Sequence, residues 1–337
     1  MTMVLAVPAL AQDSGGVSQA IVATTSALTA DQKSKVAGFV DQQVGLLKSG
    51  EPEKIRAARL ELTALPGRPG ASETFQREYA ALVRPAMENI VAGSDEHQAV
   101  NALIVLRALR SPEAVEAILA RIDPMTEKRL AIRLKAAAVV GEAIAESALA
   151  PPQVDSATRK IVAAGSSETD WVCVLHNFRS LATIAAMPKL PEPSATMALR
   201  GQSEILKSHV PRMAKEAGPS PMMDAISRAL LVVRDQFYTM PADRARQHRQ
   251  RLAPTLVAMN EVIAAQWTPV QADARARRTY AAAIAGAELL LKLSASSDLR
   301  QELAVSFAQR WEQNDKVGFT ADLAKAKAML PSFGKAE

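Results

Sequence analysis

Cys173, His176 and Asn177 come closest to a catalytic set in this sequence, and they share one expected helix. Residues three or four positions apart lie on the same side of a helix, and a thiol beside an imidazole is a pairing that activates cysteine nucleophiles. A base three residues along the same helix seldom aligns with its nucleophile, however, and the neighbouring residues are typical of a helix-packing surface. We therefore expect a small polar patch between helices, no catalytic residues, and a protein that is not an enzyme.

The histidines and the cysteine do not form a metal-binding pattern. None of the four histidines, His97, His176, His209 and His248, follows another at the spacing that places two ligands on one helix face. The single cysteine excludes an internal disulfide and any cysteine-rich metal site. The sequence also lacks a glycine-rich phosphate loop and a G-x-S-x-G motif. We expect no metal and no cofactor.

Two clusters of basic residues are candidates for binding an anionic partner. The first consists of Arg244, Arg246, His248, Arg249 and Arg251, and the second of Arg275, Arg277 and Arg278. The loop near 267–270 is short, so the two helices are expected to be antiparallel and the clusters to lie most of a helix length apart, at about 1.5 Å per residue. They then form two basic patches and not one groove.

These patches have two interpretations. One is a solvated basic face with no partner. The other is a surface for an acidic protein, an anionic glycan or a phosphate-bearing polymer, with nucleic acid not expected. The residues predicted to contact such a partner are Arg244, His248, Arg249, Arg251, Arg275 and Arg278.

The net charge supports only a mild preference for anionic partners. Residues 1–190 carry 20 basic and 20 acidic residues, so the whole net charge of +5 lies in 191–337. A small excess of this kind tolerates an anionic partner without requiring one.

Helix patterns occupy most of the chain and predict an all-α fold. The sequence is rich in alanine, aromatic residues make up 4% of it, and no alternating strand pattern occurs. Residues 94–145 hold three successive helix patterns, with expected caps at Ser94, Ser111 and Thr126. Gly141 lies inside the third pattern, where glycine costs about 1 kcal/mol relative to alanine, and indicates close approach of a neighbouring helix.

Further helices are expected on both sides of that stretch. On the N-terminal side they cover 29–50, 51–65 and 72–93, and after it 151–164 and 169–186, the last with a capping box that begins at Ser167. The segment 187–194 holds three prolines and is the candidate boundary between two regions. Beyond it we expect helices at 195–216, 221–239, 242–267, 270–294, 298–313 and 320–330, the last ended by Pro331. Pro85, Pro211 and Pro254 lie inside helices and predict kinks.

The N-terminus has the pattern of an export signal. Residues 1–11 form an apolar run that ends in Ala9-Leu10-Ala11, the A-x-A form that signal peptidase accepts, although no basic residue precedes the run. We expect residues 1–11 to be a signal-peptide remnant, cleavage near Ala11, and a periplasmic or secreted protein. Residues 12–28 are expected to be a flexible leader. No later segment is apolar and uncharged for the roughly 18 residues that a membrane span needs.

Four alanine- and leucine-rich helical segments recur along the N-terminal part. They end at residues 65, 109, 144 and 185, a spacing near the roughly 40-residue period of helical-hairpin repeats. EPEKIRAARLELTAL and EKRLAIRLKAAAVVGEA resemble the HEAT repeat, in which an acidic turn precedes an Arg/Ala-rich helix. The resemblance covers about residues 50–190, with uneven spacing and without the usual aspartate turn in every repeat. The alternative is an irregular helical bundle.

The resemblance implies antiparallel helical hairpins stacked as an α-solenoid or irregular superhelix, with HEAT-like repeats over 29–187 and longer helices over 195–331. It also implies a binding or scaffolding role and assigns no functional residues. Our first hypothesis is a non-catalytic exported scaffold that binds another protein. The second is an anion-binding module that uses the basic C-terminal helices.

A third alternative is a HEAT-like nucleic-acid repair enzyme, of the kind that uses tryptophans and an aspartate on a basic face. Asp170-Trp171 is the only pair similar to that set. The few aromatic residues offer little for base stacking, and export would separate the enzyme from its substrate. We therefore do not favour this alternative.

Overall fold

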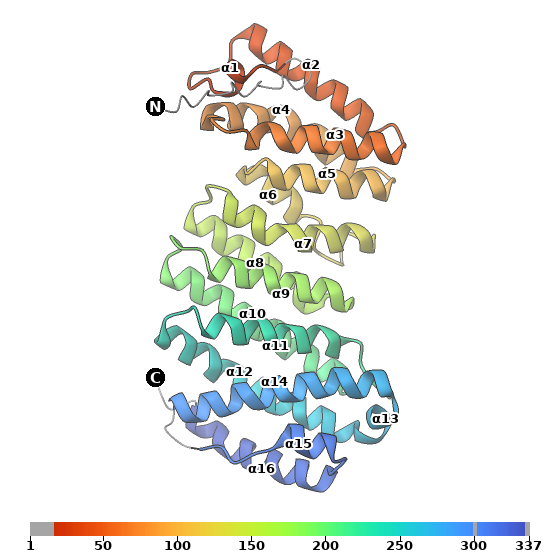
Figure 1. The fold of residues 1–337 in the computed structure, drawn as a ribbon, viewed down its shortest axis with the longest axis vertical. Helices are drawn as coiled ribbons and strands as arrows, with labels where there is room; N and C mark the ends of the chain where they lie inside the picture. The colour runs from red at the N-terminus through yellow and green to blue at the C-terminus, as the bar shows by residue number, and fades with distance from the viewer. Residues whose placement is uncertain (1–16, 299–301, 334–337) are drawn as a thin grey trace, which may run out of the picture. The chain divides into compact units, whose positions relative to one another are not determined.

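The computed structural model describes residues 17–298 and 302–333 and is all-helical, as the sequence predicts (Figure 1). These ranges contain sixteen α-helices, one 3-10 turn and no β-strand. The helices stack against their neighbours, an arrangement compatible with a helical solenoid. The chain divides into two compact units, which comprise residues 1–118 with 146–148 and residues 119–145 with 149–337.

The first unit holds the helices up to α6 and includes all of α6 except its last residue. They are α1 (Gln19–Val22), α2 (Ala30–Leu47), α3 (Pro52–Ala64), the 3-10 turn η1 (Leu65–Gly67), α4 (Glu73–Ala92), α5 (Glu96–Ala108) and α6 (Pro112–Leu119). Helix α2 packs on α3 and α4, and α5 packs on α3 and α4. Phe75 and Tyr79 of α4 are buried with stacked rings in this core, and the Tyr79 hydroxyl donates to the Leu62 carbonyl at 2.9 Å.

Residues 17–28, which the sequence predicts to belong to a flexible leader, pack against the helices of the first unit. Val17, Val22 and Leu28 are buried, and the Ser72 N–H donates to the Val22 carbonyl at 3.1 Å. The Ser72 hydroxyl donates to the Thr24 carbonyl. Ile21 is also buried, so four apolar side chains among small polar residues hold this segment against the first unit. The predicted signal peptide, residues 1–11, lies outside the described residues.

The second unit begins at Leu119, the last residue of α6, and contains the remaining helices. They are α7 (Leu130–Glu146), α8 (Pro151–Ser167), α9 (Trp171–Ala185), α10 (Glu192–Met213), α11 (Met222–Phe237), α12 (Ala242–Ala265), α13 (Trp267–Ala272), α14 (Ala274–Asp298), α15 (Phe307–Glu312) and α16 (Lys316–Phe333). The proline-rich segment 187–194 lies inside this unit, between α9 and α10, which pack together.

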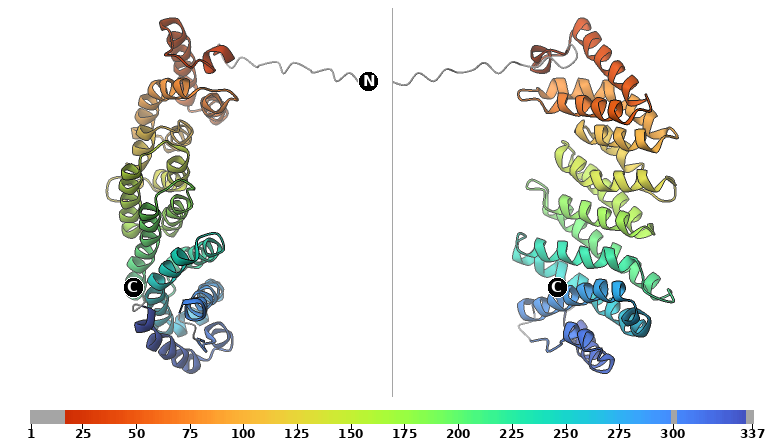
Figure 2. Two further views of the ribbon diagram at one scale, coloured as in Figure 1. Left: turned by 90° about the vertical axis from the view of Figure 1, so that its left-hand side faces the viewer. Right: turned by 45° about the vertical axis from the view of Figure 1, so that its right-hand side comes forward.

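Within the second unit, a helix typically packs on the next helix and also on the one after it. Helices α8, α10, α12 and α16 contact one another in succession, and α9, α11 and α14 do the same beside them (Figures 1 and 2). Helix α10 also packs on α9, and α14 also packs on α12. The first of these sets of helices forms one row and the second forms another. Each helix therefore packs against a neighbour in its own row and against a helix of the other row.

Gly141 marks a close approach of α7 to α9, as predicted. A Cβ atom added at Gly141 would lie 2.6 Å from the Ser180 Cα. The Ser180 hydroxyl lies in this contact, where it donates to the Ala137 carbonyl at 3.0 Å and accepts the Gly141 N–H at 3.2 Å. Only glycine allows the two backbones this separation.

Several helix ends differ from the prediction because a neighbouring acidic side chain caps the helix. Asp95 replaces Ser94 at the start of α5, and Asp170 replaces Ser167 at the start of α9. Ser167 instead belongs to α8, where its hydroxyl donates to the Ala163 carbonyl at 2.9 Å. Thr126 lies in a turn before α7, since its hydroxyl donates backward to the Asp123 carbonyl at 3.4 Å.

The C-terminal helices also depart from the prediction. Helix 270–294 is divided into α13 and α14 by Asp273, which caps α14. Helix 298–313 is reduced to α15, and part of it lies outside the described residues. Pro331 does not end α16, which continues to Phe333, because a proline this close to a helix end removes only one backbone hydrogen bond.

Candidate partner-binding surface

The arginines of the first basic cluster are engaged within the protein. Arg244 of α12 donates to the Glu192 carboxylate of α10, with 2.9 Å between Nε and Oε1, and this hydrogen bond lowers the pKa of Glu192. Arg246 pairs with Asp243 at 3.1 Å. The Arg249 guanidinium lies 5.2 Å from the centre of the Phe237 ring, within the range of a cation–π contact. Arg251 also interacts within the protein. The cluster therefore has little unpaired charge for a partner.

His248 does not belong to this basic surface, which corrects the expected site. Its side chain is fully buried and packs edge-on against Phe237, with ring centroids 5.8 Å apart. Burial, followed by the charges of Arg251 and Arg249, lowers its pKa to about 3, so the ring is neutral. The sequence holds a signal for this, since Ala245, His248 and Leu252 fall on one side of the helix and the first and last of them are apolar and buried.

The arginines of the second cluster are exposed on the surface, and the charges of Arg275 and Arg278 act on the nearby Asp273 carboxylate. Arg275, Arg277 and Arg278 are exposed, and no carboxylate of the described residues forms an ion pair with them. Asp273 lies beside them, but its Oδ1 accepts the N–H groups of Arg275 at 2.8 Å and Ala276 at 2.9 Å. These backbone hydrogen bonds lower the Asp273 pKa, so the carboxylate stays ionised as a helix cap.

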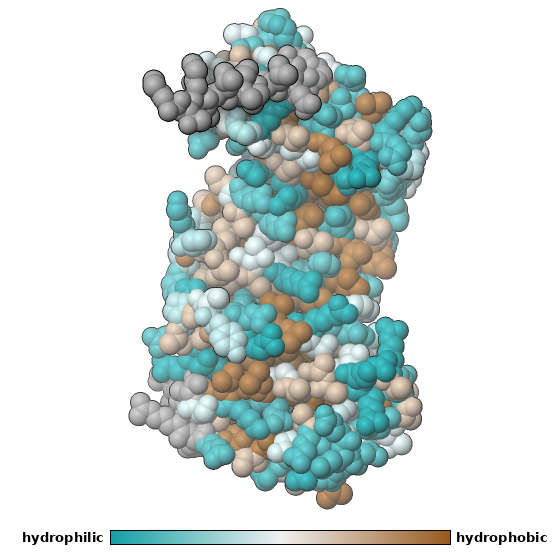
Figure 3. Space-filling model, viewed as in Figure 1, coloured by the Kyte–Doolittle hydropathy of each residue, from teal (hydrophilic) through white to brown (hydrophobic). Residues whose placement is uncertain are grey.

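An open cleft of about 470 Å³ runs beside the second cluster. Hydrophilic residues gather on the molecular surface over α13, α15 and the start of α14 (Figure 3). The cleft is lined by Gln271, Ala272, Ala274, Arg277, Arg278, Ala281, Trp311 and Glu312.

The Trp311 wall of the cleft is held rigidly. Its indole N–H donates to the Arg277 carbonyl at 3.2 Å, and its carbonyl accepts from the Gln271 amide at 3.0 Å. The ring stacks on Tyr280 with centroids 6.3 Å apart and meets Trp267 edge-on at 4.8 Å. Trp311 is only 1% exposed, so its ring lies beneath the surface of the cleft, and the exposed side chains of Arg277 and Arg278 lie beside it.

The possible nucleophile set on α9 does not assemble. Cys173 is buried, and burial together with the nearby Glu168 and Asp170 carboxylates raises the pKa of its thiol. No hydrogen bond joins Cys173 to His176 among the described residues. Burial, Arg179 and Lys135 lower the His176 pKa. A protonated, enclosed thiol is a poor nucleophile.

The Asp170-Trp171 pair is also structural. The Asp170 Oδ1 accepts the N–H groups of Val172 and Cys173, both at 3.0 Å, and thereby caps α9. The guanidinium carbon of Arg228 lies over the Trp171 ring, 5.2 Å from the ring centroid. Asp170 therefore serves as a helix cap in this fold.

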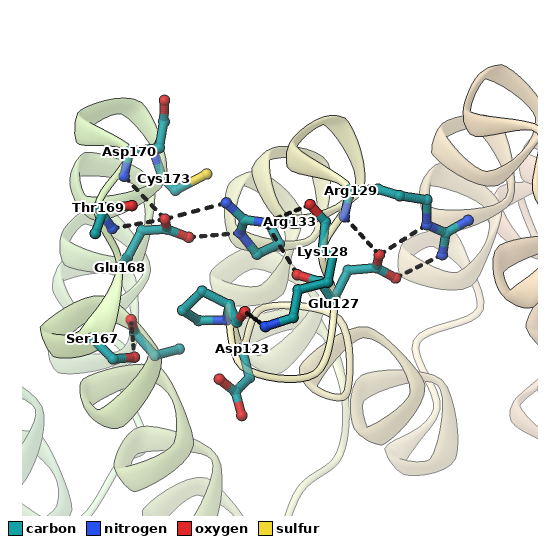
Figure 4. Close-up of polar contacts among 12 residues, drawn as sticks. Asp123, Glu127, Lys128, Arg129, Arg133, Ser167, Glu168, Thr169, Asp170 and Cys173 are labelled. Atoms are coloured by element: carbon teal, nitrogen blue, oxygen red, sulfur yellow. Dashed lines mark hydrogen bonds and ion pairs between the residues drawn. The ribbon is translucent and has the colours of Figure 1, made fainter.

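A buried ion pair next to these residues was missed by sequence reasoning (Figure 4). Arg133 of α7 donates to Glu168, with 2.8 Å between Nε and Oε2, and Glu168 is completely buried. Arg133 also donates to the carbonyls of Glu127 and Lys128, both at 3.1 Å. The pair links the entry of α7 to the entry of α9.

A parallel feature lies in the connection before α7, where Glu127 accepts from Arg129 at 2.6 Å and lies near Arg121 at 3.5 Å. These hydrogen bonds and charges lower the Glu127 pKa. Glu127 and Glu168 each stand three residues before a helix. This acidic residue ahead of an arginine-bearing helix is the signal that could have revealed the network.

Comparisons with known proteins add no family to this description. No protein family model matches the chain, and a search of curated proteins finds no significant match. Among the described residues, no group of histidine, cysteine and acidic side chains could hold a metal ion. None of the described helices has the length and apolar character needed to span a membrane.

Proposed function

We propose that this chain is a HEAT-like α-solenoid that serves as a non-catalytic exported scaffold and binds another protein through its helical surface. The observation that supports the proposal is the packing of the second unit, where helices contact both the next helix and the one after it. Stacked hairpins of this kind generate extended surface from repeated local contacts. Binding on such a surface needs no catalytic group.

Exposed apolar side chains on one row of helices give a place to begin the test. Leu231 of α11 is 49% exposed and Leu289 of α14 is 40% exposed. A photo-crosslinking amino acid at either position, in the protein expressed in its native host, should capture one recurrent protein. That protein, once purified, should bind the purified chain with a dissociation constant in the micromolar range or below.

A matched control places the same photo-crosslinker at Leu60 of α3, which is 51% exposed but lies in the first unit. Capture of unrelated proteins at all three positions, or failure of the captured protein to bind the purified chain, would contradict the scaffold role. Turnover of the captured protein that disappears in Cys173→Ala would contradict its non-catalytic character.

A further inference from the structure

We propose that Met125 is a site of reversible oxidation, where a peroxide converts the thioether to a sulfoxide without disturbing the fold. The residue lies in the connection between α6 and α7, within the second unit. The inference goes beyond the binding function proposed above and does not depend on it. Two features carry it, the exposure of the Met125 side chain and the way in which its loop is held.

Met125 is by far the most exposed methionine among the described residues. Its exposed fraction is 71%, whereas Met87, Met213 and Met223 have none. A peroxide must reach a sulfur atom to oxidise it, so reaction should begin at Met125. The other described methionines are buried or half-buried, namely Met187, Met197, Met222, Met240, Met259 and Met329.

The loop that carries Met125 is held by hydrogen bonds that do not involve the sulfur atom. The Met125 N–H donates to Asp123 Oδ1 at 2.8 Å, and the Glu127 N–H donates to the Asp123 carbonyl at 2.9 Å. The Lys128 ammonium donates to the Pro124 carbonyl at 2.9 Å (Figure 4). Because none of these contacts uses the thioether, the loop keeps its shape when the sulfur gains an oxygen atom.

The reaction is a two-electron oxidation of sulfur by hydrogen peroxide. A sulfur lone pair attacks one peroxide oxygen, the O–O bond breaks, and the departing hydroxide takes the proton of the new S–OH group. The products are methionine sulfoxide and one water molecule. A methionine sulfoxide reductase reverses the change, because the oxygen leaves as water while two thiols form a disulfide.

This oxidation replaces an exposed apolar side chain with a polar one. At a buried methionine the same change would place a polar group in the core and weaken the packing. At Met125 the sulfoxide stays in solvent, so the fold is retained and a reductase can reach the group without unfolding of the chain.

The test exposes the full chain to hydrogen peroxide and follows each methionine by peptide mapping and mass spectrometry. We expect the Met125 sulfoxide to form on the order of tenfold faster than that of the buried Met87, and faster than that of every half-buried methionine. Thermal unfolding followed by circular dichroism should give the same midpoint before and after this first oxidation. A methionine sulfoxide reductase with a thiol reductant should restore the original mass.

The variant Met125→Leu should lose one rapid addition of an oxygen atom from the intact mass. The matched variant Met240→Leu, at a half-buried methionine, should retain that addition at an unchanged rate. Oxidation of Met187, Met197, Met240 or Met329 as fast as Met125 would overturn the inference. A lower unfolding midpoint of the Met125 sulfoxide, or a sulfoxide that the reductase leaves unchanged, would overturn it as well.

Discussion

Glu168 is a charged group without any contact to solvent, yet each of its oxygens accepts hydrogen bonds. Arg133 donates to both, with Nε to Oε2 at 2.8 Å and Nη2 to Oε1 at 3.4 Å. The N–H groups of Thr169 and Asp170 donate to Oε1 at 2.8 and 3.0 Å. A buried ion pair is tolerated only when its partners are satisfied in this way.

Removing one member of the pair should therefore be severe. We expect Glu168→Ala to lower the free energy of unfolding by roughly 3–5 kcal/mol, because Arg133 would remain buried without its counter-charge. The double variant Arg133→Met, Glu168→Leu should recover most of the loss. Urea unfolding followed by far-UV circular dichroism measures both. A double variant as unstable as the single one would show that the pair's carboxylate–backbone contacts matter more than its charge.

His248 predicts a pH dependence of stability. Its folded pKa of about 3 lies below the ordinary value of 6.5, so below pH 6.5 the unfolded chain binds a proton that the folded chain does not. The contribution of His248 to stability is therefore lost progressively as the pH falls from about 6.5 toward 3. We expect His248→Leu to flatten the decline in unfolding free energy between pH 7 and 5, the part of that window where most carboxylates stay ionised.

The control is His97→Leu, the same replacement at an exposed histidine, which should leave the slope unchanged. His248→Leu should also raise stability at pH 7 by about 1–2 kcal/mol, since neither ring nitrogen has a hydrogen-bond partner in the structure. An unaltered slope in His248→Leu would mean that the buried ring is not the titrating group.

At the scale of elements, the contact of α7 with α9 depends on the missing side chain of Gly141. Alanine is intrinsically the better helix former by about 1 kcal/mol. We nevertheless expect Gly141→Ala to destabilise the protein by about 1–3 kcal/mol, because its Cβ would collide with the Ser180 backbone. Thermal unfolding followed by circular dichroism provides the measurement.

Gly38 of α2 offers the opposite case, since a Cβ added there meets nothing within 4 Å. Gly38→Ala should therefore stabilise its helix by up to about 1 kcal/mol. Stabilisation by both substitutions would show that α7 and α9 can separate without cost.

The positions of the helices could largely be predicted from the sequence, but several of their capping residues could not. Periodicity and proline positions located the helices, and Ser111 caps α6 as expected. The choice between Ser167 and Asp170 for α9 depended on where α8 stops. Because Ser167 can hydrogen-bond to a carbonyl of its own helix, the local sequence permits either cap, and the burial of Glu168 beside Arg133 decides between them.

The candidate surface was predicted only in part for a related reason. Both arginine clusters are visible in the sequence, but Arg244 finds its carboxylate 52 residues away on α10. A pairing over that distance comes from the packing of helices and leaves no local trace. The second cluster has no such distant carboxylate among the described residues. Its arginines are therefore exposed, as the sequence predicts for a basic patch.

At the scale of the whole molecule, the expected export gives a direct prediction. If residues 1–11 are removed by signal peptidase, the protein recovered from its native host should begin at Gln12 and occur in the envelope or the medium. Intact-mass measurement of each cell fraction tests this. A chain that retains Met1 in the cytoplasm would contradict export and would return the nucleic-acid repair alternative to consideration.

The placement of the tryptophans has an optical consequence. All three, Trp171, Trp267 and Trp311, belong to the second unit, and two of them share one aromatic cluster. Indole emission therefore follows the folding of that unit alone, whereas far-UV ellipticity sums the helices of both. Both signals can be recorded during urea unfolding of the unlabelled chain. Their unfolding transitions should occur at different urea concentrations if the two units unfold independently, and at the same concentration if the units unfold together.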